Sequence, residues 1–140
     1  MCCLKRPFDD QSFPRNRLES EAVLALLASE SPEREFIRSD ALVLENTLNP
    51  IKERAARVDQ WLRAGKTESG ENVAIHARIV ALVGLGLKNF DALHIAVAEH
   101  CNADVFGTCD DKLLAAAKRN APHLKVRVLG IVELAGEVLK

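Results

Sequence analysis

Aromatic residues are scarce in this sequence of 140 residues, which contains one Trp, no Tyr and five Phe. Proteins that hold single-stranded nucleic acid by stacking its bases need aromatic side chains, so this mode of binding has little support. A basic excess is also missing, because the formal net charge is −1. Since phosphate neutralisation supplies most non-specific nucleic-acid affinity, any site for a polyanion has to be local.

Basic residues do gather near the N-terminus, where Lys5, Arg6, Arg15 and Arg17 occur within a short stretch. Two interpretations stay open for this stretch. It is either a local contact surface for a polyanion or a solvated loop followed by the start of a helix.

Long apolar runs are missing too. None could span a bilayer, and the opening residues MCCLKRPFDD contain no hydrophobic region of a signal peptide. We therefore expect a cytoplasmic protein without a membrane segment. The cysteines are then expected to be thiols, with Cys101 and Cys109 as small buried apolar residues. Because no C-x-x-C pair occurs, a structural zinc site is not expected.

Length and composition fit one domain over residues 1–140, since 48% of the residues are hydrophobic and 28% are charged. Hydrophobic periodicity and turn residues predict the elements. Helices are expected over 17–29, 40–49, 50–65, 73–87, 89–102 and 109–120, and strands over 36–39, 103–108 and 124–130. Segments 6–16 and 66–72 are expected to be loops, and 131–140 a helical or irregular tail. Within these elements, Pro50 is expected at a first helical position. One apolar face of the first helix is expected to carry Leu18, Ala22, Val23, Leu26 and Leu27.

Strands that alternate with helices indicate an α/β fold with a parallel sheet and helices on both faces. In such sheets, ligands bind beyond the carboxyl ends of the strands. Glu45 follows soon after one predicted strand, Asp110 follows directly after another, and Asp91 opens a helix that packs on the sheet. If these carboxylates converge, a divalent cation has to hold them, because like charges at close range destabilise one another. Oxygen ligands favour Mg²⁺ or Mn²⁺.

Each acid also has a simpler interpretation. Asp and Glu are common in the first turn of helices, where they accept hydrogen bonds from free amides and complement the helix dipole. Spacing along the chain does not separate a set of helix caps from a metal site.

The segment GLKNFDALHIAVAEHCNADVFGTCDDKLL resembles the C-terminal half of a PIN domain. The features that carry this resemblance are Gly86, the motif DALHIAVA, the strand ADVFGT and the triplet TCD. The segment CCLKRPFDDQSFPRNRLESEAVL is similar to the start of a bacterial PIN-like subgroup, just after its first strand. The resemblance implies a three-layer α/β/α fold. It also implies a metal-dependent ribonuclease that hydrolyses single-stranded RNA with three or four acids and Mg²⁺ or Mn²⁺.

The resemblance assigns roles to particular residues. Asp91, Asp110 and Glu45 would be the metal ligands and the catalytic acids, and Thr108 would be the hydroxyl residue beside Asp110. Asp111 is a second-choice ligand.

One part of the family pattern is missing from this sequence. PIN domains begin with a strand that is central in the sheet and ends in a metal-binding Asp. That strand and its acid would lie ahead of CCLKRPF, where this sequence has only Met1. Either the start is set too far downstream or the chain is a truncated relative. For the chain as given, we expect two strands without a common partner, low stability, and weak or absent nuclease activity.

The leading hypothesis is a PIN-type ribonuclease, as the toxin of a toxin–antitoxin pair. Its partners would be an RNA substrate held by Lys5, Arg6 and Arg15, an antitoxin protein, and a second copy in a homodimer. The alternative is a non-catalytic PIN-like module that binds RNA or a partner protein. A small flavodoxin-like regulatory domain has only the βα pattern in its favour. His94, one turn after Asp91, is either a packed core histidine or a base.

Overall fold

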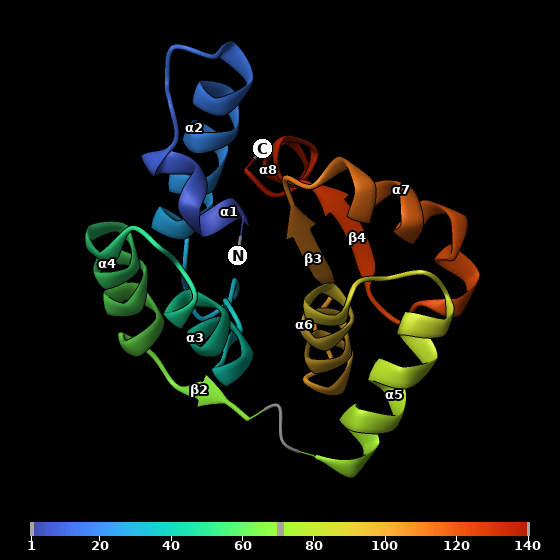
Figure 1. The fold of residues 1–140 in the computed structure, drawn as a ribbon. Helices are drawn as coiled ribbons and strands as arrows, with labels where there is room; N and C mark the ends of the chain where they lie inside the picture. The colour runs from blue at the N-terminus through green and yellow to red at the C-terminus, as the bar shows by residue number, and fades with distance from the viewer. Residues whose placement is uncertain (1, 70–71, 140) are drawn as a thin grey trace.

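The computed structural model describes residues 2–69 and 72–139 (Figure 1). The longer helices are α2 (Pro14–Ala28), α3 (Asp40–Thr47), α4 (Lys52–Arg63), α5 (Val73–Gly84), α6 (Asn89–His100), α7 (Asp111–Arg119) and α8 (Ile131–Val138). The shorter helical segments are α1 (Cys2–Lys5), η1 (Arg6–Phe8) and η2 (Ala121–His123). The strands are β1 (Arg38–Ser39), β2 (Thr67–Glu68), β3 (Val105–Thr108) and β4 (Arg127–Gly130). Helices and short parallel strands form a three-layer α/β/α fold, which confirms the predicted class.

The helices predicted between residues 17 and 120 are present, with ends shifted by a few residues. The prediction that Pro50 is a first helical residue is wrong. The helix α4 begins at Lys52, and ahead of it the side chain of Asn49 accepts a hydrogen bond from the Ile51 amide at 3.1 Å. This local turn satisfies an amide that a helix starting at Pro50 would have left free.

The two segments predicted as loops contain regular structure. Residues 6–16 include η1 and the start of α2, and residues 66–72 include β2. A strand of two residues has no periodicity to detect, because it exists only through its pairing with β1. The tail left open between helix and irregular structure is the helix α8.

Side-chain caps explain where two of the helices begin. The Ser39 hydroxyl accepts a hydrogen bond from the Leu42 amide at 3.2 Å, and this bond starts α3 directly after β1. The Asn72 side chain accepts one from the Ala74 amide at 2.8 Å and starts α5. Each cap satisfies an amide that has no partner inside the helix.

The helix α5 ends in a turn that needs glycine. Gly86 has a φ of 101°, and its amide donates to the Val83 carbonyl at 3.0 Å while the Leu87 amide donates to the Leu82 carbonyl at 3.3 Å. This pattern is a Schellman motif, in which a residue of positive φ reverses the chain after the helix. The turn directs Leu87 into the core and leads to α6.

The strands form two separate parallel pairs rather than the single sheet predicted. One pair joins β1 to β2 over Arg38–Thr67 and Ser39–Glu68, and the other joins β3 to β4 from Val105–Arg127 to Thr108–Gly130. Across residues 2–69 and 72–139, no strand lies between β1 and β3. The expectation of two strands without a common partner is therefore met in the described chain, and α1 contacts β3 and α4 where the pairs face each other (Figure 1).

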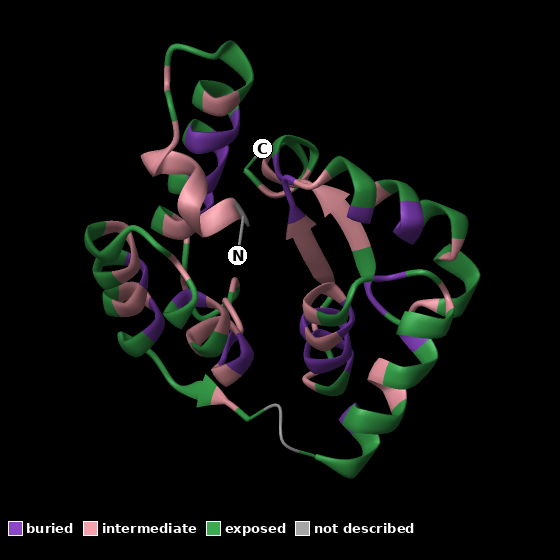
Figure 2. Ribbon diagram, in the orientation of Figure 1, coloured by how far each residue is buried: buried purple, intermediate pink, exposed green. Residues whose placement is uncertain are grey.

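Two clusters of buried side chains stabilise the fold (Figure 2). The larger one joins α5, α6, α7 and the residue ahead of β4, and its members are Ile75, Leu82, Leu87, Ala92, Ile95, Ala96, Val97, Leu113 and Val126. The smaller one joins α2, α8 and the end of β3, and its members are Ala22, Val23, Leu26, Cys109 and Ile131. The predicted apolar face of α2 supplies Ala22, Val23 and Leu26 to this cluster, but placing Leu18 on it is wrong, since 54% of its surface is exposed. Cys109 is buried, as predicted, whereas Cys101 is only partly buried, so its predicted burial is wrong.

A buried ion pair ties α5 to the end of α6. The Arg78 guanidinium donates to Glu99 at 2.9 and 3.1 Å, and the Lys125 amide donates to the same carboxylate at 3.1 Å. Glu99 is 9% exposed, so these donors replace the water that its charge has lost. None of the helices in the described ranges has the length and apolar character needed to cross a bilayer.

Candidate active site

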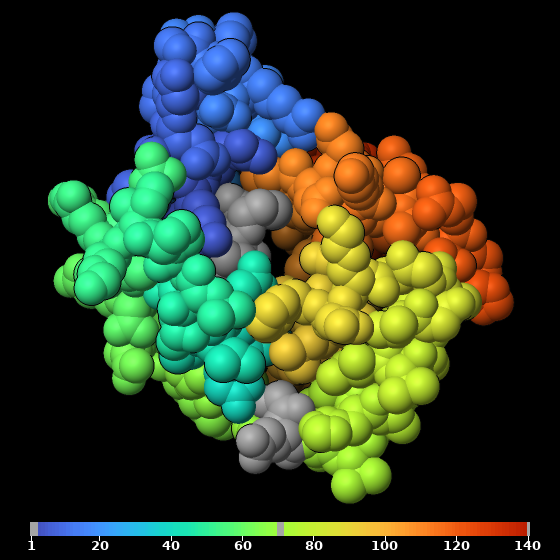
Figure 3. Space-filling view, viewed as in Figure 1, coloured from blue at the N-terminus to red at the C-terminus, as the bar shows by residue number. Residues whose placement is uncertain are grey.

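Three elements carry the predicted acids. Glu45 lies on α3, Asp91 lies in the first turn of α6, and Asp110 lies two residues after the end of β3, at the start of α7. The helices α3 and α6 pack against each other, and Figure 3 shows their surfaces in contact. Packing of α3 on α6 therefore brings Glu45 near Asp91. The helix α3 follows β1, in one strand pair, and α6 precedes β3, in the other.

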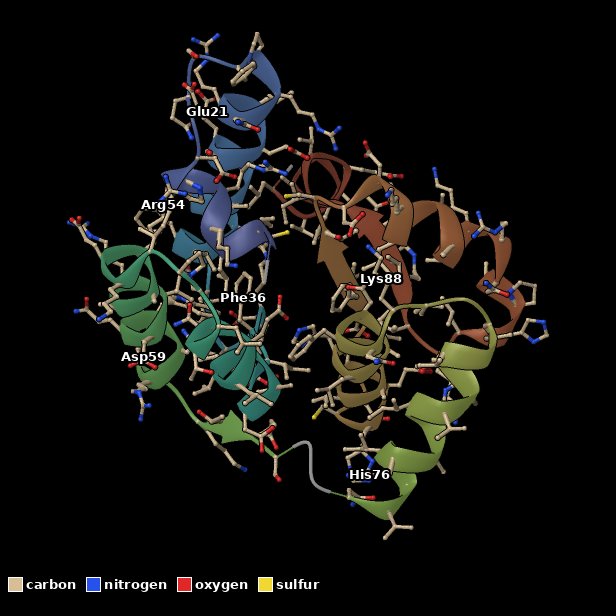
Figure 4. The ribbon with its side chains drawn as sticks, viewed as in Figure 1. Glu21, Phe36, Arg54, Asp59, His76 and Lys88 are labelled. Atoms are coloured by element: carbon tan, nitrogen blue, oxygen red, sulfur yellow. The ribbon has the colours of Figure 1, made fainter. Side chains whose placement is uncertain are left out.

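Asp91 is the acid whose pKa is affected by both of the others. It is half-buried, and its pKa is raised, first because burial removes water from the carboxylate and then because Asp110 and Glu45 carry negative charge nearby. His94 and Lys88 act on the pKa of Asp91 in the opposite direction. Figure 4 shows Lys88 at the start of α6. The three carboxylates thus share one electrostatic environment, with Asp91 as the common member.

Glu45 is bound by His94, for which the sequence left two interpretations open, a packed core histidine or a base. His94 Nε2 forms a hydrogen bond with Glu45 Oε2, and the ring of Phe90 stacks on the imidazole at 6.2 Å between centroids. Burial raises the pKa of Glu45, but the hydrogen bond with His94 and the nearby charge of Lys5 act against this, and the pKa of Glu45 is lowered. His94 is 7% exposed, and its Nδ1 is buried without a partner in the described part of the chain.

Asp110 has the role of a helix cap. Its Oδ1 accepts hydrogen bonds from the amides of Lys112 at 2.9 Å and Leu113 at 3.3 Å, and these bonds start α7. Its own amide donates to the hydroxyl oxygen of Thr108 at 3.0 Å. Thr108 is 2% exposed, so it fixes the turn between β3 and α7. The capping interpretation is correct for Asp110, while its Oδ2 takes no part in the cap.

Asp111 and Arg15 bind each other. The two nitrogens of the guanidinium each donate to one carboxylate oxygen at 2.7 Å, and Arg15 also donates to Glu19 at 3.2 Å. Arg15 lowers the pKa of Asp111, and the two carboxylates raise that of Arg15. Both groups of this pair are exposed, so the pair is accessible although its charges are neutralised.

Arg6 and Lys5, the other residues predicted to contact RNA, differ in how far their charges are already paired. Arg6 donates to Asp9 and to Asn16 at 3.0 Å and lies 3.3 Å from Glu19, so its guanidinium is held inside the N-terminal region. Lys5 is half-buried, and its charge reaches Glu45. Contact of Lys5, Arg6 or Arg15 with RNA stays a prediction, and for both arginines it would have to compete with ion pairs already formed.

The carboxylate oxygens suit Mg²⁺ or Mn²⁺ in kind, because these ions prefer hard oxygen ligands. Glu45 Oε1 and Asp110 Oδ2 lie outside the bonds to His94 and to the α7 amides. Within residues 2–69 and 72–139, however, no three His, Cys, Asp or Glu side chains are grouped closely enough to hold one ion. The roles of Asp91, Asp110, Glu45 and Thr108 as metal-binding or catalytic residues therefore stay predictions.

Sequence reasoning missed two contacts beside these acids. The bond between His94 and Glu45 joins residues on different helices, and only the place of His94 one turn after Asp91 pointed toward the site. The second contact joins Cys3 on α1 to Cys109, whose sulfurs lie 3.4 Å apart. No pattern in the sequence connects these two cysteines.

Comparison with known proteins gives one match. The model of the family described as PIN domain matches residues 13–119, a range that includes Glu45, Asp91, Thr108 and Asp110. No curated protein and no solved structure matches the chain. The match confirms the resemblance read from the DALHIAVA and ADVFGT motifs.

Proposed function

Because the chain belongs to the PIN domain family, a nuclease-type family, we propose that it is a divalent-metal-dependent ribonuclease acting on single-stranded RNA. One observation supports this proposal above the others. Asp91 is a half-buried carboxylate whose pKa is raised by burial and by the charges of Asp110 and Glu45. Carboxylates whose pKa is shifted by burial and by neighbouring acids are typical of sites that bind a cation or perform chemistry.

Mg²⁺ or Mn²⁺ would be held by Asp91 and Asp110, with Glu45 as the third ligand. When bound, such an ion supplies a Lewis acid that lowers the pKa of water and offsets the charge of a phosphodiester. Asp110 has Oδ2 to offer, because only Oδ1 caps α7. Glu45 would have to exchange its bond with His94 for this role.

The neighbouring residues would set the geometry of these acids. Thr108 accepts the Asp110 amide and fixes the turn that presents this carboxylate at the end of β3. His94 orients Glu45 through its Nε2, and the ring of Phe90 stacks on the imidazole. Buried residues on two elements thus orient Asp110 and Glu45 separately.

As part of the same proposal, the protein acts in the cytoplasm as the toxin of a toxin–antitoxin pair, and it forms a homodimer. Lys5, Arg6 and Arg15 would contact the RNA backbone. Expression of the chain in bacteria would then arrest growth, and Asp91→Asn would relieve the arrest. Growth that is equal with and without the substitution would remove the toxin part of the proposal.

A non-catalytic module that binds RNA or a partner protein is the second candidate. It is favoured by the internal use of the acids, since Glu45 is bonded to His94, Asp110 caps α7, and Asp111 pairs with Arg15. Titration calorimetry with Mn²⁺ separates the two candidates. Saturable binding that Asp91→Asn abolishes supports the nuclease, whereas no binding to a folded wild-type chain supports the module.

Activity is tested with a fluorescent single-stranded RNA in the presence and absence of Mn²⁺. We expect cleavage that needs the ion and that Asp91→Asn reduces by at least about 100-fold, because one of few charged ligands is lost. Mn²⁺ should also raise the Tm of the wild type by binding the native state, and it should leave the Tm of the variant unchanged.

The matched control is Asp104→Asn. Asp104 is exposed and lies at the opposite end of β3 from Asp110, so this substitution makes the same chemical change away from the acids. It should retain both cleavage and the Mn²⁺ effect on Tm. Cleavage that survives Asp91→Asn or EDTA contradicts the proposal.

A further inference from the structure

Cys3 and Cys109 meet although 106 positions separate them in the sequence. Cys3 belongs to α1, and Cys109 lies in the turn between β3 and α7. Their sulfurs are 3.4 Å apart, and the Cys3 sulfur also lies 3.6 Å from the Gly107 carbonyl, which places it against the end of β3. The sulfurs would have to approach to about 2.0 Å to form a bond, a movement within reach of side-chain rotation.

The surroundings of the two thiols differ in a way that matters for reactivity. Cys109 is 5% exposed, and the Arg6 guanidinium interacts with its sulfur. Cys3 is half-buried, so a small reagent in solution reaches Cys3 more readily. One thiol is therefore accessible to a reagent, and the second is held beside it and shielded from solvent.

We propose that Cys3 and Cys109 form a dithiol site that low-molecular-weight disulfides of the glutathione type oxidise to an intramolecular disulfide. Cys3 loses its proton to water and attacks the reagent, which gives a mixed disulfide and one glutathione thiol. The Cys109 sulfur then attacks Cys3, loses its own proton to water, and releases a second glutathione thiol. Both leaving thiolates take up protons, so one oxidised glutathione becomes two thiols while the protein dithiol becomes a disulfide.

This bond would fasten α1 to the turn that carries Asp110. The site does not rest on the proposed nuclease function, because it is defined by the two cysteines alone. Since the bond would close a loop of more than one hundred residues, it should restrict the unfolded chain strongly. We expect the Tm of the oxidised protein to rise by about 10 °C.

The test uses the full chain with Cys2→Ser and Cys101→Ser, which leaves only the proposed pair. The protein is incubated with oxidised glutathione, and the mass of the intact protein is measured without reductant. We expect a loss of two hydrogens and no retained glutathione. Trypsin should then release residues 1–5 linked to residues 89–112. Because residues 1–5 contain both Cys2 and Cys3 in the wild-type protein, fragmentation of its linked peptide by tandem mass spectrometry should assign the bond to Cys3.

Two controls isolate the pair. Adding Cys3→Ser or Cys109→Ser to the same background should abolish the loss of two hydrogens, and circular dichroism checks that each variant is folded. A glutathione adduct that persists when both cysteines are present contradicts the proposal, as does a disulfide between two chains. A protein that keeps both free thiols while its Tm is unchanged contradicts it equally.

Discussion

Replacing Asp91 with Asn is expected to stabilise the protein near neutral pH, although the proposed activity depends on Asp91. In the folded chain its pKa is raised by burial and by the charges of Asp110 and Glu45, so the ionised carboxylate costs free energy there. Asparagine has almost the same shape and no charge. A shift of one pKa unit corresponds to about 1.4 kcal/mol, and solvent screening reduces the effect for a half-buried group. We expect a gain of about 0.5–1 kcal/mol, or about 2–4 °C in Tm.

The gain should depend on pH in a defined direction. Below the unfolded-state pKa of about 3.9, Asp91 is protonated in both states and imposes no electrostatic cost. As the pH rises through that value and then through the raised folded-state pKa, the wild type loses stability relative to Asp91→Asn. Above the folded-state pKa the difference is complete. The two proteins should therefore diverge with rising pH and stay apart at neutral pH.

Thermal unfolding followed by circular dichroism measures this difference from about pH 8 down to about pH 4, across the range where aspartate titrates. EDTA has to be present, because a bound cation would offset the repulsion. Asp104→Asn serves again as the control and should change Tm by about 1 °C or less, since the side chain is exposed. An Asp91→Asn protein that is less stable than the wild type at neutral pH, or a difference that does not vary with pH, would refute the reasoning.

Two further substitutions test the fold. Arg78→Met removes the side chain that binds the buried Glu99 and should cost about 3–5 kcal/mol in urea unfolding, against about 0.5 kcal/mol or less for Arg63→Met on the surface. Equal costs would contradict the role of the buried pair. Gly86→Ala should cost about 1–2 kcal/mol because the φ of Gly86 is positive. Gly136→Ala, inside α8 with open space around it, should instead stabilise by about 0.5–1 kcal/mol. A stabilising Gly86→Ala would exclude strain in that turn.

The helices could be predicted because their signals are local. Ser39, Asn72 and Asp110 cap helices with their own side chains, and Gly86 ends α5 through its own backbone. Each signal lies within a few residues of the helix end that it defines. β2 had no such signal, since Thr67–Glu68 is a strand only by pairing with β1. Its existence depends on how α3 and α4 fold back, which local propensity does not encode.

For the candidate site, the sequence supplied residues whose roles stay predictions, and it supplied almost none of their contacts. Resemblance to the family pointed to Asp91, Asp110 and Glu45, and all lie in the matched range. The bond of Glu45 to His94 spans 49 positions, and the ion pair of Arg15 with Asp111 spans 96. Such contacts follow from the packing of α3 on α6 and of the N-terminal segment on β3. Because these contacts join residues that are far apart in the chain, local sequence spacing does not reveal them.

The division of the strands into two pairs has a consequence for the site. Glu45 is carried by α3, which follows β1, whereas Asp110 follows β3, and no backbone ladder joins these strands in residues 2–69 and 72–139. Side chains link the two parts where the acids lie, chiefly through His94 and Glu45. Because side-chain contacts are more easily broken than a ladder of backbone hydrogen bonds, the distance from Glu45 to Asp91 should vary more than the distances within either pair.

A variable distance between Glu45 and Asp91 would give the expected low stability and the expected weak activity a common cause. Both expectations stay predictions. A strand inserted between β1 and β3 would pair with both and fix α3 relative to the end of β3. An added N-terminal segment able to form that strand should therefore raise Tm and Mn²⁺ affinity together. A rise in Tm without tighter Mn²⁺ binding would show that the position of Glu45 is not what limits the site, and its bond with His94 would then be the remaining obstacle.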